Sequence, residues 1–447
     1  MAPPRSVLRH LRDLRPLTVA LTTLAVTGLA FGGGITPAAA DPVRDRQFWI
    51  DDYNIDEAWQ ISRGEGVKVA VIDSGVSAHE DLKGAVVGSR DFSGTGHNGK
   101  EPIGSKASKF HGTAVAGVVA GRGHGDDAGT IGVAPEADLL SASVWLGDGL
   151  PRNAVPQRKQ VADAVRWSVD SGAKVINLSL GWNDPSWPES WDDAFQYAAD
   201  RDVVVIACVG NRSQGARQAW SPSTVPGVVG VGGLTQTGKV ARAETAPGIA
   251  VNLMGPGEDM AVPWYTGGYG TADGSSFASP FVAGVAALIR SAYPEMSAAD
   301  VINRLYRSAD PVKGHKGRSS EDKPEPTVGY GRVDPLEALE SDVAKVGRNP
   351  DGSLKDWIAM HRKAESTEPE ELGGNAKLES DADVSDRPDD KPSSDAQSTE
   401  AARLGPPPQS GAGPVALIGF GTALVLVVSG GIVTSRRIRR GQGRTGD

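Results

Sequence analysis

The fold follows from one apolar run, Val67-Lys68-Val69-Ala70-Val71-Ile72-Asp73. Nearly every residue before the aspartate is apolar, as expected of a strand that is buried on both faces. Three later runs have the same character: Val175–Leu180, Val203–Val209 and Val228–Val231. Because strands covered on both faces are typical of parallel sheets, the four runs predict such a sheet.

Stretches with helical spacing lie between these runs, at residues 112–119, 160–171, 190–200 and 276–292. The alternation of strands and helices predicts an α/β protein, a three-layer sandwich with a mostly parallel sheet, which we assign to residues 49–340. In open sheets of this kind, ligands bind outside the carboxyl ends of the strands. Functional residues are therefore expected just past those ends.

The composition excludes several classes of protein. The 447-residue chain has 46 Lys and Arg against 55 Asp and Glu, a formal net charge of -9. A nucleic-acid-binding surface needs clustered Lys and Arg, so we expect no nucleic-acid partner. The single cysteine, Cys208, excludes an intrachain disulfide and a cysteine zinc site. It lies in an apolar run, where we interpret it as a buried core residue.

Residues 1–40 have the layout of a secretory signal peptide. Several arginines precede an apolar run at residues 17–31, and three alanines end at Ala40, after which we expect cleavage. The apolar run is short for a bilayer span, which argues against an N-terminal membrane anchor. Residues 41–48 would then form a short extension before the folded domain.

The C-terminal part predicts a membrane anchor. Residues 341–413 are acidic, polar and end in a proline cluster, which indicates a disordered linker. Residues 415–433 are uncharged and mostly apolar, long enough to cross a bilayer as a helix. Residues 434–447 are basic, and basic flanks tend to stay in the cytoplasm. We therefore expect a single-pass protein of the cell membrane with an extracellular domain and a cytoplasmic C terminus.

Three polar residues stand at places where chemistry is expected. Asp73 ends the first apolar run, His111 opens a small-residue helix, and Ser276 lies at the start of an apolar helix. A hydroxyl that attacks, an imidazole that carries its proton and a carboxylate that holds the ring together form a nucleophilic triad. Each residue alone could be a cap or turn residue, and only the combination points to acyl transfer. This chemistry needs no metal and no cofactor, and we expect neither.

The same region offers two donors for a developing oxyanion. Ser276 lies where the N–H groups of a helix start are unpaired and where the helix dipole favours negative charge. Asn211 closes the apolar run that begins at Val203, which would direct its side-chain amide at the same carbonyl oxygen. We therefore expect Asn211 and the Ser276 N–H to form an oxyanion hole.

The segments around these residues resemble the three catalytic signatures of the subtilisin family of serine peptidases. They read IDSGV at 72–76, HGTAVAG at 111–117 and GSSFASP at 274–280. Three further segments match in family order: GVAP at 132–135, NLSLG at 177–181 and YGRVD at 330–334. The resemblance implies that Asp73, His111 and Ser276 are the triad and that Asn211 is the oxyanion donor.

The resemblance also implies how substrate binds. Ser179, Leu180 and Gly181 would pair with the main chain of a polypeptide substrate as an extra strand, so that backbone bonds bind it and pockets select side chains. One departure is Ser275, which stands where the family usually has threonine. This small change should preserve the turn before the nucleophile.

The layout of the whole chain resembles the mycosins, membrane-anchored subtilases that accompany type VII secretion systems. The shared features are the signal peptide, a very short prosegment, a proline-containing linker, one membrane span and a basic tail. The resemblance implies cleavage of secreted proteins at the outer face of the membrane and a partnership with type VII secretion machinery. With only residues 41–48 before the domain, we do not expect maturation through an inhibitory prodomain.

Two features stay open at the level of sequence. Trp145, Trp182, Trp187 and Trp191 flank the expected substrate groove, where they could line an apolar pocket or only pack the domain. The loop at residues 121–132 contains oxygen ligands of the kind that bind calcium, but it lacks the spacing of a metal motif. We interpret it as a solvated loop.

These observations predict a membrane-anchored extracellular serine endopeptidase that cleaves secreted proteins. Two alternatives remain. The chain could be a cell-surface protease of broad specificity, or a scaffold subunit of a secretion complex whose catalysis is dispensable.

Overall fold

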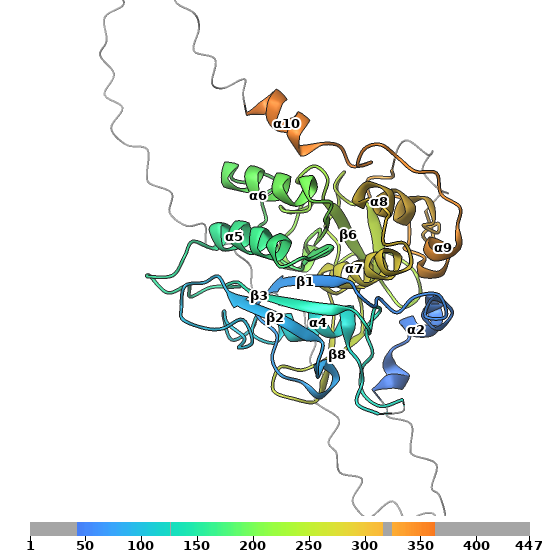
Figure 1. Ribbon diagram of the computed structural model, residues 1–447, viewed down its shortest axis with the longest axis horizontal. Coiled ribbons are helices and arrows are strands. Elements are labelled where there is room, and N and C mark those ends of the chain that lie inside the picture. The colour runs from blue at the N-terminus through green and yellow to red at the C-terminus, as the bar shows by residue number, and fades with distance from the viewer. Residues whose placement is uncertain (1–42, 126, 316–323, 363–447) are drawn as a thin grey trace, which may run out of the picture.

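The computed structural model describes residues 43–125, 127–315 and 324–362. Figure 1 shows a central sheet with helices packed on both of its faces. The expected signal peptide, membrane span and cytoplasmic tail lie outside the described residues, and so does the expected linker beyond residue 362. The structure therefore bears on the predicted peptidase domain and on the residues directly next to it.

Seven parallel strands form the central sheet in the order β2-β3-β1-β4-β5-β6-β7. Their bounds are β1 Lys68–Asp73, β2 Val86–Asp91, β3 Asp138–Ser143, β4 Val175–Leu178, β5 Val204–Cys208, β6 Val229–Leu234 and β7 Leu253–Pro256. The order reverses at β1, which lies between β3 and β4. Such a reversal opens a crevice outside the carboxyl ends of the strands, and Asp73 is the last residue of β1.

The sheet separates two layers of helices. Val69 and Val71 pack in one core with α4 (His111–Ala120) and α7 (Ser275–Ala292). Their neighbours Ala70 and Ile72 pack in a second core with α5 (Gln157–Asp170) and α6 (Glu189–Asp200). Side chains of a strand alternate between its faces, so a strand covered on both sides must be apolar throughout. The predicted three-layer α/β sandwich is confirmed.

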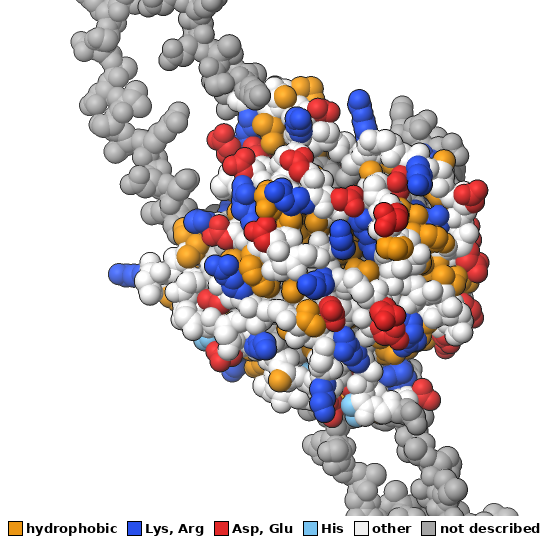
Figure 2. Space-filling view, viewed as in Figure 1, with side chains coloured by type: hydrophobic (Ala, Val, Ile, Leu, Met, Phe, Trp, Pro, Cys, Tyr) orange, Lys and Arg blue, Asp and Glu red, His pale blue; other side chains and the backbone are white. Residues whose placement is uncertain are grey.

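The remaining elements are short and lie around this sandwich. The antiparallel hairpin of β8 (Met260–Pro263) and β9 (Tyr269–Ala272) leads into α7. The others are η1 Arg44–Arg46, α2 Trp49–Asp52, α3 Ile55–Ala58, η2 Glu80–Leu82, η3 Arg212–Gln214, α8 Ala298–Arg307, α9 Pro335–Glu340 and α10 Leu354–His361. Acidic and basic side chains are interspersed over the face shown in Figure 2, which therefore carries mixed charge.

Helix α7 combines core packing with the position of the expected nucleophile. Among the described residues it is the one helix long and apolar enough to cross a bilayer, but 89% of it is buried inside the protein. It is therefore a core helix. Pro280 is its sixth residue and cannot donate to the carbonyl of Ser276, which instead accepts from Ser179 Oγ (2.8 Å).

The structure differs from the expected linker at residues 341–362, here called the C-terminal strap. The backbone N–H of Val346 donates to Asp300 Oδ1 (2.7 Å), and the Asn349 side chain donates to Gly227 O (3.0 Å). Further along, Leu354 is buried and Arg362 Nε donates to Asp192 Oδ2 (2.7 Å). Polar side chains thus tie the strap to the domain, and Figure 1 shows α10 beside α6.

Candidate active site

Two of the predicted catalytic side chains meet in the interior. Asp73 ends the central strand β1, His111 is the first residue of α4, and both side chains are fully buried. His111 Nδ1 lies 2.9 Å from each carboxylate oxygen of Asp73. Asp73 Oδ1 also accepts from the backbone N–H of Ser74 (2.7 Å). The contacts of Nδ1 with both carboxylate oxygens fix the orientation of the imidazole ring, and the Ser74 N–H holds the carboxylate in place.

The start of α4 is pressed against the loop after β1, which explains the small residue beside the histidine. A Cβ built at Gly112 would lie 2.4 Å from Gly75 O, so only glycine fits. The Gly112 N–H donates to Ser74 Oγ (3.0 Å). Strand β1 and helix α4 are thereby held at a fixed separation, which sets the distance between Asp73 and His111.

The other ring nitrogen of His111, Nε2, is available to accept a proton. His111 Nε2 is buried and has no hydrogen-bond partner among the described residues. With Asp73 as acceptor, the hydrogen-bond network assigns the proton to Nδ1 and leaves Nε2 as the basic nitrogen of the neutral ring. A buried polar atom without a partner costs about 1–3 kcal/mol, and such atoms are retained where function needs them.

Ser276 and Asn211 border the same small space. Ser276 is the second residue of α7, and the preceding Gly274 adopts φ +138°. A Cβ built at Gly274 would lie 3.1 Å from Ser276 Oγ and 3.2 Å from Asn211 Nδ2. Asn211 Oδ1 accepts from the N–H (3.0 Å) and the hydroxyl (2.8 Å) of Ser275. These bonds turn the amide nitrogen of Asn211 toward the space beside the serine hydroxyl.

The substrate-binding residues predicted after β4 have two different roles in the structure. Ser179 Oγ donates to Ser276 O (2.8 Å) and accepts from Asn177 Nδ2 (2.8 Å). Its side chain therefore supports the backbone of Ser276 and is already engaged. Leu180 and Gly181 instead line a hollow beside Ser276 and Asn211. That hollow is bounded by the segments 145–147, 179–182, 210–211 and 275–276.

The structure decides between the two roles left open for the tryptophans. Trp145 and Trp182 line the hollow, together with Trp220, which the sequence analysis did not single out. Trp191 is fully buried in the core, and Trp187 packs on the strap residue Trp357 with ring centroids 4.6 Å apart. Trp220 stands in an irregular segment without a motif, so no sequence signal places it at the site.

Cys208 is buried, as the sequence analysis predicts, but it also lines the hollow. Its Sγ lies 3.7 Å from Leu180 O. Burial raises the pKa of the thiol to about 12, because the thiolate would lose its hydration. Cys208 therefore presents a neutral, weakly polar surface to the hollow.

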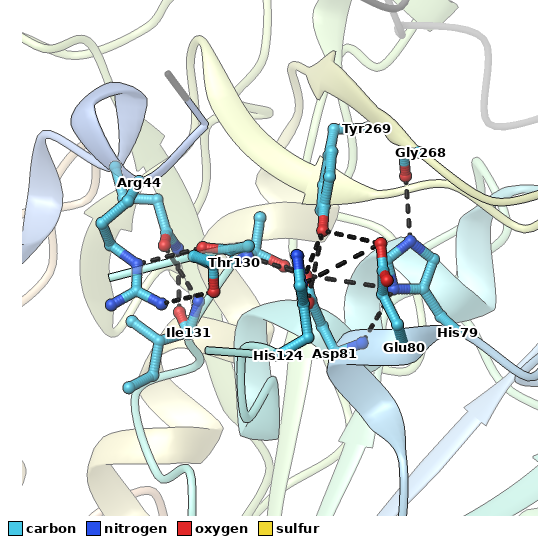
Figure 3. Close-up of polar contacts among 12 residues, drawn as sticks. Arg44, His79, Glu80, Asp81, His124, Thr130, Ile131, Gly268 and Tyr269 are labelled. Atoms are coloured by element: carbon cyan, nitrogen blue, oxygen red, sulfur yellow. Dashed lines mark hydrogen bonds and ion pairs between the residues drawn. The ribbon is translucent and has the colours of Figure 1, made fainter. Parts of the chain in front are cut away.

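The loop that we interpret as solvated is held by a buried polar cluster (Figure 3). Asp81 is fully buried, and its Oδ2 accepts from Thr130 N (2.7 Å) while its Oδ1 lies 2.7 Å from His124 Nδ1. Arg44 Nε donates to Gly129 O (3.0 Å) from the N-terminal side. His124 and Asp127 are exposed, as the interpretation as a solvated loop predicts, whereas residues 129–132 at the end of the loop are buried. The described part of the chain contains no group of three or more His, Cys, Asp or Glu side chains arranged to hold a metal.

The same cluster reaches the hairpin that precedes Ser276. Tyr269 of β9 places its hydroxyl 3.3 Å from Asp81 Oδ1, and His79 Nε2 lies 3.0 Å from Gly268 O. Figure 3 shows both contacts between η2 and the hairpin. Because Gly274 and Ser276 directly follow β9, the cluster supports the approach of the chain to the site.

Comparison with known proteins agrees with this geometry. The sequence profile of the subtilase family matches residues 64–331. Subtilisin DY of Bacillus licheniformis is 34% identical over 251 residues, which cover 55% of this chain and 85% of that protein. Mycosin-4 of Mycobacterium tuberculosis (strain ATCC 25618 / H37Rv) is 31% identical over 379 residues, 76% of this chain and 75% of that protein.

The fold has a close counterpart among solved structures. The crystal structure of MycP1 from the ESX-1 type VII secretion system superposes with a TM-score of 0.57 at 26% identity. The superposition covers 71% of this chain and 90% of MycP1. The chain therefore belongs to the subtilase family of serine endopeptidases and is related to the mycosins.

Proposed function

We propose that Asp73, His111 and Ser276 form the catalytic triad of a membrane-anchored extracellular endopeptidase associated with type VII secretion. One observation carries the catalytic part of the proposal. His111 is bound through Nδ1 to both oxygens of Asp73, while its buried Nε2 has no partner among the described residues. Such a ring is arranged to accept a proton at Nε2 alone.

The proposed reaction uses these atoms in sequence. His111 Nε2 takes the proton of Ser276 Oγ as that oxygen attacks a peptide carbonyl, and Asp73 stabilises the imidazolium that forms. Asn211 Nδ2 and the Ser276 N–H donate to the oxyanion. The imidazolium then returns the proton to the leaving amine, and water releases the acyl group by the same steps in reverse.

Binding of the substrate main chain is proposed for Leu180 and Gly181. Both line the hollow beside Ser276, and Gly181 lets the backbone run close to neighbouring chain because a Cβ there would lie 2.9 Å from Ser221 O. For Ser179 the proposal is limited to its backbone, since its hydroxyl binds the nucleophile helix.

The association with secretion rests on the relatives. Mycosin-4 matches 76% of this chain, whereas the subtilase profile stops at residue 331. MycP1 is described as part of the ESX-1 type VII secretion system. Together with the expected signal peptide and the expected span at residues 415–433, this supports a peptidase that is held at the outer face of the membrane and acts on secreted polypeptides.

The catalytic proposal is tested by labelling the full-length chain with a fluorophosphonate probe, which reacts only with an activated serine. We expect labelling of the wild type and none of Ser276→Ala. Ser291→Ala is the matched control, because Ser291 lies at the other end of α7 and its hydroxyl donates, among the described residues, to Glu65 O (2.8 Å). Labelling of Ser276→Ala at the wild-type rate would refute the proposal.

Anchoring and secretion are tested in the cells that produce the chain. The full-length chain should be found in the membrane fraction, and a chain that ends at Arg362 should be released. Deletion of the chain should impair type VII secretion, and Ser276→Ala should impair cleavage of secreted proteins. Release of the full-length chain, or normal secretion after deletion, would contradict the respective part of the proposal.

A further inference from the structure

We propose that Trp220 restricts this peptidase to substrates with a small residue, glycine, alanine or serine, on the acyl side of the cleaved bond. The inference rests on the proposed function, because it assumes that Ser276 attacks the substrate carbonyl. It goes further by naming the residue that selects the substrate and the chemical class that is selected. The argument depends on the position, the walls and the size of the hollow beside Ser276.

The position of the hollow identifies which substrate residue it receives. It is lined by Ser276, by Asn211 and by the segment 179–182. The substrate carbonyl held between Ser276 Oγ and Asn211 Nδ2 belongs to the residue on the acyl side of the cleaved bond. When the main chain of this residue runs along Leu180 and Gly181, its side chain enters the hollow.

Trp220 lies against two of the segments that line the hollow, 179–182 and 210–211. From one wall, a Cβ built at Gly210 would lie 2.4 Å from Trp220 Cδ2. From the other, a Cβ built at Gly181 would lie 3.3 Å from Trp220 Cβ and Cε3. The indole thus contacts both backbone segments, and at Gly210 only glycine fits beside the ring.

The indole is held firmly in this place. Trp220 is 4% exposed, and its Nε1 donates to Asn183 Oδ1 (2.9 Å). Its backbone N–H donates to Val209 O (3.0 Å), and its carbonyl accepts from Ser223 Oγ (2.6 Å). A bulky substrate side chain would have to displace a ring that is anchored at both its edge and its backbone.

The remaining space is small and uncharged. The hollow leaves a cavity of about 20 Å³ for a water-sized sphere, room for little more than one water molecule. A hydrogen, a methyl or a hydroxymethyl group fits such a space, whereas an isobutyl or benzyl group does not. The described residues that line it include no Asp, Glu, Lys, Arg or His, so it offers no partner for a charged side chain.

The test compares peptide p-nitroanilides that differ only in the residue before the cleaved bond, with the full-length chain as enzyme. We expect kcat/KM for alanine to exceed that for phenylalanine and leucine by at least about tenfold, since a single methylene in a fitted pocket changes the rate about 10–200-fold. In Trp220→Ala the ratio of alanine to phenylalanine should fall by about tenfold or more, with a rise in the rate for phenylalanine.

The controls separate specificity from folding. Trp167→Ala removes a tryptophan that packs on Phe92 in the α5 layer, away from the hollow, and should keep the wild-type ratio. Should Trp220→Ala fail to fold, Trp220→Phe removes part of the ring and should move the ratio in the same direction.

Two results would overturn the inference. The first is a wild-type enzyme that cleaves after phenylalanine or leucine as fast as after alanine. The second is a folded Trp220→Ala enzyme with an unchanged ratio. Absence of hydrolysis for every peptide, with no fluorophosphonate labelling, would instead refute the proposed function itself, so the two failures are distinguishable.

Discussion

The attachment of the C-terminal strap should depend on pH through one carboxyl group. Asp351 lies between Asn252, whose Nδ2 donates to Oδ1 (2.7 Å), and Tyr306, whose hydroxyl binds Oδ2. Tyr306 in turn stacks on Tyr330 with ring centroids 4.2 Å apart. Desolvation by this burial raises the pKa of Asp351 to about 7, and the hydrogen bond from Tyr306 opposes the shift only in part.

The sign follows from comparison with the unfolded chain, where an aspartate has a pKa of about 3.9. Because the pKa of Asp351 is higher in the folded chain, its protonated carboxyl adds to the free energy of unfolding. This contribution is fully present below pH 4 and is lost as the pH rises to about 7. The pKa of Asp351 differs by about 3 units between the folded and the unfolded chain, which corresponds to at most about 4 kcal/mol in the free energy of unfolding. About 3 kcal/mol of this is lost between pH 5 and pH 8.

The assay is thermal unfolding of the full-length chain at pH 5 and pH 8, in a Ser276→Ala background that prevents autolysis. Asp351→Asn mimics the protonated carboxyl, because its Oδ1 can accept from Asn252 while its Nδ2 donates to the Tyr306 hydroxyl. We expect the melting temperature of the wild type to fall by about 6 °C more than that of the variant between the two pH values, at about 2 °C per kcal/mol. Asp342→Asn, at an exposed strap position, is the control and should behave as the wild type. Equal pH dependence in the wild type and Asp351→Asn would refute the reasoning.

Four further outcomes are expected. Asp73→Asn should fold but lower kcat by about 10⁴, as a triad histidine does when its tautomer is no longer fixed, which steady-state kinetics would show. Asn211→Ala should lower kcat by about 10²–10³, the range measured when a subtilisin loses this kind of oxyanion donor, and an unchanged labelling rate would contradict that role. Cys208 should resist iodoacetamide at pH 8 in the folded chain and react after unfolding, because its thiol pKa is raised to about 12, and mass spectrometry would detect the adduct. Gly210→Ala should lower the melting temperature by several degrees, since its Cβ would lie 2.4 Å from the Trp220 ring and its φ is +90°, which L side chains rarely adopt.

The parts of the fold that sequence predicts are those with a single dominant cause. β1, β4, β5 and β6 are apolar on both faces and were predicted as strands. The interior strand β3 was missed, because two serines interrupt its apolar residues. The edge strand β2 was missed, because its residues are half-exposed or exposed and its pattern is broken by Gly88. The strand β7 is short and contains glycine and proline, which sequence patterns assign to turns.

In the candidate site too, local sequence patterns identify some residues, whereas contacts between distant parts of the chain are not predicted. Asp73 and His111 are named by local motifs, and their contact follows from the central position of β1 and the start of α4. The engagement of the Ser179 hydroxyl with Ser276 O joins residues far apart in sequence, and no local pattern announces it. The same holds for Trp220, whose role depends on two glycines brought to it by different strands.

The sequence analysis ends the folded domain at residue 340, whereas the strap at residues 341–362 is also attached to it. Composition does not show what a polar residue binds. Asn349, Asp351 and Arg362 read as linker residues, yet each has a partner on the folded domain. The strap therefore carries the chain from α9 to α6, and Arg362 lies on the layer of α5 and α6. The helices α4 and α7, which carry His111 and Ser276, form the opposite layer. None of the residues that line the hollow comes from the strap, so the strap leaves the proposed substrate site accessible.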